Sequence, residues 1–169
     1  MLKTLRQFLV TPEPGVAQAL AALRALFALT FAAQVLLAAL LAASLSFFAG
    51  EQEASALLSQ ILLVLSLLQV PLGATLSLLS ARSGGKGAAL SGTIMAGVVL
   101  ASTAWFLAFS LLVGSAPLYL VLSLLVVVNA YAVGFFLCGR LAKVAVMNPR
   151  VEPKQRRVGE VLRERSPHP

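Results

Sequence analysis

Long stretches without a charged residue alternate with short polar segments along this chain. The longest uncharged stretch, residues 87–139, lies between Lys86 and Arg140 and contains no Asp, Glu, Lys, Arg or His. As one helix it would extend about 80 Å, whereas the hydrocarbon core of a bilayer is only ~30 Å thick. It must therefore fold back once, and residues 114–117, Gly-Ser-Ala-Pro, are typical of a turn. The pattern predicts two membrane-spanning helices joined by an uncharged hairpin.

The first half of the chain repeats this pattern. Two further uncharged runs are separated by a segment with Glu51 and Glu53, and the basic segment 82–86 precedes the second half. We therefore predict an all-α integral membrane protein with a four-transmembrane-helix bundle. Its spans are expected at about 25–50, 54–81, 88–113 and 118–139, within a bundle domain of residues 20–147.

Residues 1–19 are expected to form an amphipathic, interfacial segment. Its apolar residues fall at helical spacing: Leu2, Leu5, Phe8 and Leu9. A short helix lying on the headgroups suits this pattern, and a frayed terminus is the alternative because so short a helix is marginal. Thr11 and Pro12 suit the cap and the first position of the next helix.

Composition and charge support a membrane protein. Of the 169 residues 59% are hydrophobic and 11% are charged, with a mean hydropathy of +0.93; soluble proteins are about 45–50% apolar and about 25% charged. The net charge of +7 would suggest nucleic acid in a soluble protein. Here the basic residues flank the spans, where they set topology, and we expect no nucleic-acid partner.

All 13 Lys and Arg residues fall on one side of the four-span arrangement. The positive-inside rule then places both termini in the cytoplasm (N-in/C-in), and we expect a bacterial inner (plasma) membrane protein. The tail, residues 148–169, is expected to be solvated or to contact anionic lipid headgroups or an acidic partner. Its basic residues are Arg150, Lys154, Arg156, Arg157, Arg163 and Arg165.

Small residues recur at helical spacing within the spans. Those expected to let helices pack closely are Gly73, Gly92, Ala96, Gly97, Ala101 and Gly134. Span one carries a further alanine seam at positions 21, 25, 28, 32 and 39. On span two, Ser59, Ser66, Gly73 and Ser80 repeat every seven residues, and this polar face must meet protein or water rather than lipid.

The chain offers little for catalysis. No span contains an ionisable acid or base, which disfavours proton- and ion-coupled carriers, and no nucleophile–base pair is evident. We expect no enzyme activity, cofactor or metal site. The single cysteine, Cys138, excludes an internal disulfide; its position is compatible with S-acylation, but a buried small residue is the preferred interpretation.

Three amides lie at a similar depth of roughly 15–20 Å from the basic side. We hypothesise that Gln34, Gln69 and Asn129 meet in one hydrogen-bonded layer against Gly97, with Ser66 on the same polar face. An amide left in lipid would cost several kcal/mol, so each should turn inward. The layer would be structural or contact another subunit; a polar site for a neutral ligand is the alternative.

Two functions follow from this pattern. The first is a non-catalytic accessory or assembly subunit whose partners are other membrane proteins. The alternative is a homo-oligomeric channel or carrier for a neutral or hydrophobic solute. What the polar face of span two meets distinguishes them: water in a lumen favours transport, and dry contact with a helix favours a subunit.

Overall fold

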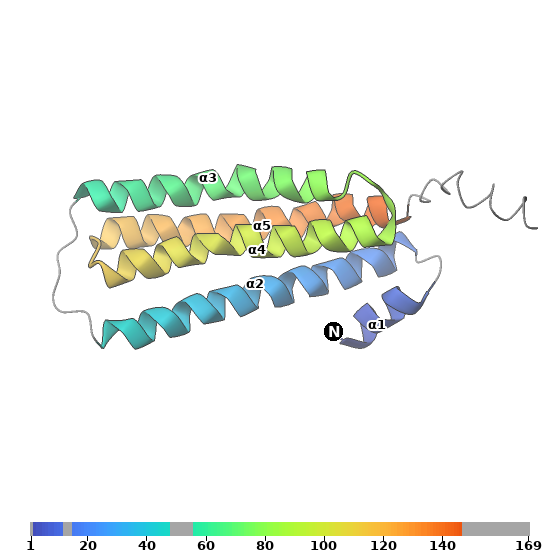
Figure 1. Cartoon of the computed structure of the whole chain (residues 1–169), viewed down its shortest axis with the longest axis horizontal. Coiled ribbons are helices and arrows are strands. Elements are labelled where there is room, and N and C mark those ends of the chain that lie inside the picture. Colours follow the sequence, from blue (N-terminus) through green and yellow to red (C-terminus); the bar gives the residue numbers. More distant parts are fainter. Residues whose placement is uncertain (1, 12–14, 48–55, 147–169) are drawn as a thin grey trace, which may run out of the picture.

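The computed structural model describes residues 2–11, 15–47 and 56–146. Its elements in chain order are α1 (Leu2–Val10), α2 (Val16–Ser46), α3 (Ala56–Ser80), α4 (Gly85–Leu112) and α5 (Pro117–Val146). Helices α2 to α5 are each long and apolar enough to cross a membrane. The predicted fold class, an all-α membrane protein with a bundle of four spanning helices, is therefore confirmed (Figure 1).

Both described turns between spanning helices occur where the sequence predicts them. Gly84 and Gly85 have φ angles of 74° and 81° between α3 and α4, and Gly114 has a φ of 68° between α4 and α5. Residues other than glycine rarely adopt such positive φ angles, so these glycines permit the chain to reverse within a short turn. The basic residues predicted to contact lipid or a partner, 150–165, lie outside the described residues, as does the turn between the first two spans.

Helices α2 and α5 extend well beyond their predicted spans at one end. Helix α2 begins at Val16 and α5 continues to Val146, so both project past the apolar core on the basic side. The predicted cap at Thr11 is wrong, because its N–H and hydroxyl both donate to the Gln7 carbonyl and so terminate α1. Gly15 precedes α2 as its N-cap, without a side-chain cap. Pro12 lies outside the described residues.

Helices α4 and α5 form the centre of the bundle, with α2 and α3 on either side (Figure 1). Both flanking helices contact α4 and α5, and within the described residues α2 does not contact α3. Much of the interior is alanine, including Ala89, Ala96, Ala101 and Ala130, which are fully buried. Small residues let the helix backbones approach closely and pack through van der Waals contacts. These contacts hold the helices together in lipid, where no hydrophobic driving force acts between them.

The residues predicted to permit close packing all lie between helices. Ala96 and Ala101 are fully buried. A methyl group on Gly73 would lie 2.8 Å from the Leu100 side chain, and one on Gly92 would lie 2.8 Å from the Ser77 carbonyl.

Two further glycines are more tightly enclosed. Gly97 of α4 faces Thr30 of α2, and Gly134 of α5 faces the Phe27 ring of α2. In both places a Cβ atom would overlap the facing side chain. These glycines set how closely α2 approaches the two central helices.

Helix α1 is present, and two residues of its predicted apolar face pack against protein. Phe8 is fully buried and Leu5 packs against the core, whereas Leu9 is exposed. The Lys86 ammonium donates to the carbonyls of Phe8 and Thr11, and lies 5.5 Å from the centre of the Phe8 ring. The C-terminal carbonyls of α1 are therefore satisfied by a cation at the start of α4.

Candidate functional site

The polar face of α3 is buried against its neighbours. Of the predicted face, Ser59, Ser66 and Gly73 are inaccessible, as is the adjoining Ser77. Ser80 is half-buried, and its hydroxyl donates to the Leu76 carbonyl of its own helix. The Ser77 hydroxyl donates to the Gly92 carbonyl of α4 at 2.8 Å, and the Ser59 and Ser115 hydroxyls are 2.9 Å apart. This face therefore meets α4 and the turn that follows it, in dry contact with protein.

Ser66 differs from Ser77, although both are fully buried on that face. Among the described residues its hydroxyl has no hydrogen-bond partner, whereas Ser77 is bonded to the backbone of α4. We expect Ser66→Ala to leave the unfolding free energy unchanged or to raise it, because an unsatisfied polar group is removed. Ser77→Ala should lower it by ~0.6–2 kcal/mol, the range for interhelical hydrogen bonds in membranes. Unfolding in mixed micelles measures both; equal losses would contradict the assignment.

The hypothesised amide layer does not form. The Oε1 atom of Gln34 accepts a hydrogen bond from the Trp105 indole at 3.3 Å, between α2 and α4. Asn129 is exposed on α5, where it lines a shallow groove against α3. Gln69 is half-buried on α3, and among the described residues no hydrogen bond joins these three amides to one another.

The rotation of α5 explains this correction. Near Asn129 its inward face includes Val126, Val127, Ala130 and Gly134. Asn129 is one residue from Ala130 and therefore points about 100° away from it around the helix. The sequence does contain a signal for the bond that forms, since an indole N–H deep in an apolar span requires an acceptor.

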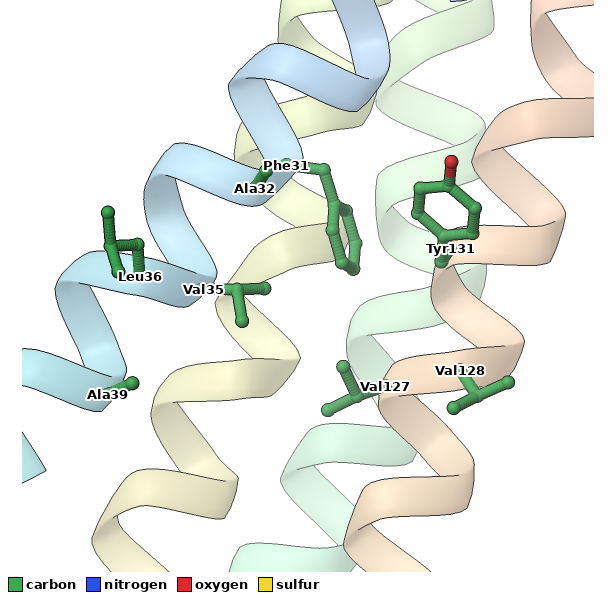
Figure 2. Close-up of a pocket in the computed structure, with 8 residues that line it drawn as sticks. All are labelled: Phe31, Ala32, Val35, Leu36, Ala39, Val127, Val128 and Tyr131. Atoms are coloured by element: carbon green, nitrogen blue, oxygen red, sulfur yellow. The ribbon is translucent and has the colours of Figure 1, made fainter.

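A groove that the sequence does not predict lies between α2 and α5. Figure 1 shows α2 leaning away from the other spanning helices towards its C-terminal end. The space that opens has a volume of about 660 Å³. It is lined by Phe31, Ala32, Val35, Leu36, Ala39, Val127, Val128 and Tyr131 (Figure 2). The groove is apolar and opens on the outer surface of the bundle, where lipid would surround it.

An aromatic cluster closes the groove at its end nearer the basic side of the bundle. The Phe31 and Tyr131 rings meet edge to face with centres 5.3 Å apart, and Phe27 lies 5.6 Å from each of them. Phe135 stacks on Tyr131 at 6.1 Å. Four rings from two helices thus hold α2 to α5 at this level.

Arg24 lies beyond this cluster, with its guanidinium carbon 4.1 Å from the centre of the Phe135 ring. The side chain is half-buried, and its buried Nε has no acceptor within residues 2–11, 15–47 and 56–146. The described residues include no Asp or Glu, so within them the guanidinium has no carboxylate to pair with. Arg24 is therefore positioned by a cation–π contact and lacks an anionic partner in the described part of the chain.

The other described cations gather at the same end of the bundle. They are Lys3, Arg6, Arg82, Lys86, Arg140 and Lys143. The alternating directions of the four helices bring the start of α2, the turn after α3 and the end of α5 together there (Figure 1). This end presents positive charge to its surroundings.

Cys138 is fully buried near the same end of α5. The thiol is covered by protein, as expected for a small residue in a helix contact, and an acylating enzyme would not reach it in this state.

The fold and these contacts define a four-span helical membrane protein with a lateral apolar groove and a basic end. No protein family, curated protein or solved structure matches this chain.

Proposed function

We propose that this protein is a non-catalytic accessory or assembly subunit of a larger membrane complex. The observation that carries the proposal is the dry contact of the polar face of α3. The Ser59 and Ser77 hydroxyls form hydrogen bonds within the chain and Ser66 is fully buried, so the face best suited to line a water-filled path faces protein instead. The exposed sides of the spans are mostly apolar, which suits lipid or other helices.

The alanine seam of α2 supports a helical partner. Ala21, Ala32 and Ala39 are exposed, and Ala25 and Ala28 are half-buried. The contacts of α2 within the bundle use other alanines, among them Ala19 and Ala22. A partner helix could therefore approach α2 closely without disturbing the bundle.

The basic end supports an orientation with both termini in the cytoplasm of a bacterial cell. We expect Ser83→Cys, in the exposed turn after α3, to resist a membrane-impermeant maleimide applied to spheroplasts and to react after lysis. Ala116→Cys, in the exposed turn at the opposite end, should react before lysis. The buried native Cys138 should add little background. The reverse labelling pattern would overturn the orientation.

The subunit proposal is tested by native mass spectrometry of the chain extracted from its own membranes, with photo-crosslinking in the cell. Photoreactive residues replace exposed Ala21, Leu68 and Phe136, on α2, α3 and α5, and buried Thr103 is the matched control. A foreign membrane protein in fixed stoichiometry, crosslinked from exposed positions and not from Thr103, is the expected result. A closed homo-oligomer that passes a neutral solute through liposomes would overturn the proposal and establish the channel.

A further inference from the structure

The groove between α2 and α5 and the Arg24 guanidinium lie along one line on the surface of the bundle. Fifteen residues of α2 separate Arg24 from Ala39 at the far end of the groove, which corresponds to about 22 Å of helix. Half of a bilayer, headgroups included, is also about 20–22 Å thick. The length of a lipid in one leaflet therefore matches the distance along α2 from Arg24 to Ala39.

Charge specifies the headgroup. Arg24 has no carboxylate within the described residues, and its neighbours at this end of the bundle are further cations. A half-buried guanidinium without a counter-ion is stabilised by an anion, and its fork of donors suits a phosphate. The groove is apolar, so the same ligand must also carry a hydrocarbon chain.

Tyr131 supports this orientation of the ligand. Figure 2 shows its hydroxyl pointing towards the Phe31 end of the groove, which is the end nearer Arg24. Its ring is partly exposed, and no described residue forms a hydrogen bond with the hydroxyl. A donor at this position, between an apolar groove and a cation, suits an ester carbonyl of a lipid.

We propose that this groove binds one anionic glycerophospholipid from the leaflet at the basic end of the bundle. One acyl chain lies between α2 and α5 along Ala32, Val35 and Val127, and the phosphate pairs with Arg24. The lipid covers the interface where α2 leans away from the bundle. Because the lipid covers Ala32 and Ala39, a helical partner would contact the alanine seam of α2 at Ala21, Ala25 and Ala28, and the lipid itself requires no protein partner.

The test is native mass spectrometry of the full chain, titrated in micelles with dioleoyl-phosphatidylglycerol or dioleoyl-phosphatidylcholine. The two lipids share their acyl chains and differ in net charge. The wild-type protein should retain one phosphatidylglycerol with a clear preference. Arg24→Gln should lower the affinity for phosphatidylglycerol by about tenfold or more, since a charge-assisted contact is lost. The matched control Arg82→Gln, an exposed cation at the same end, should bind as the wild type does. Unchanged binding in Arg24→Gln, or an equal loss in Arg82→Gln, would overturn the headgroup assignment.

The chain site is tested separately. Ala39→Phe fills the far end of the groove. It should lower the affinity for both lipids and leave the preference for phosphatidylglycerol unchanged. In the wild-type protein, a phosphatidylglycerol with a photoreactive group near the end of one acyl chain should crosslink to the segment around Ala39 or Val127, which needs no variant to fold. Crosslinks confined to the outer face of α3 would overturn the proposal.

Discussion

Replacing Gly134 by alanine is expected to destabilise the bundle by about 1–3 kcal/mol, the usual cost of forcing a methyl group into a packed interior. The added Cβ would overlap the Phe27 ring and lie 3.0 Å from the Leu100 side chain. The ring has little room to move, since Phe31 and Tyr131 pack against it. Either α2 shifts away from α5 or Phe27 leaves its position.

The matched control is Gly139→Ala on the same helix, where an added Cβ meets nothing within 4 Å. Alanine is favoured over glycine in a helix by up to ~1 kcal/mol, so this variant should be as stable as the wild type or more so. Unfolding in mixed micelles measures both. Adding Phe27→Leu to Gly134→Ala should recover part of the loss, which a double-mutant cycle quantifies. Equal stabilities of the two glycine variants would show that α2 and α5 are not in this close contact.

Lys86→Met is expected to release α1 from the bundle while leaving the four spanning helices folded. Lys86 is the second residue of α4, where a cation opposes the helix dipole, and its ammonium instead satisfies the Phe8 and Thr11 carbonyls. Hydrogen bonds to a charged group contribute about 1.5–3 kcal/mol, which is sufficient to hold so short a helix in place. Without them the amide protons of α1 should exchange at least tenfold faster.

Hydrogen exchange of the whole protein in micelles measures this effect, with α4 as the internal reference. Lys143→Met is the matched control, since Lys143 is an exposed cation at the same end of the bundle and should not alter exchange in α1. If α1 exchanged equally fast in the wild type and in Lys86→Met, the lysine would not be the group that holds it.

The sequence predicts which small residues lie between helices, but it does not predict which way the intramembrane amides face. Gly97 and Gly134 stand out as small residues in apolar runs, and the structure places both beneath a side chain of α2. Asn129 was expected inside because burial of an amide in lipid is costly, yet the contacts of Ala130 and Gly134 turn it outward. Depth along a helix can be counted from the sequence, but rotation about its axis depends on which neighbour it meets.

The sequence by itself determined the four spans, the glycine turns and the collection of Lys and Arg at one end, because hydropathy and charge along the chain act on each segment separately. Only the tertiary structure decided that α4 and α5 lie at the centre, that α2 leans outward to open a groove, and that Arg24 lies over Phe135. The physical reason is that lipid tails are about as apolar as the leucine side chains of a neighbouring helix. A leucine-rich helix can therefore rotate or tilt with little change in free energy. Close contacts such as that of Gly134 with Phe27 then fix one arrangement among many that the hydropathy pattern allows.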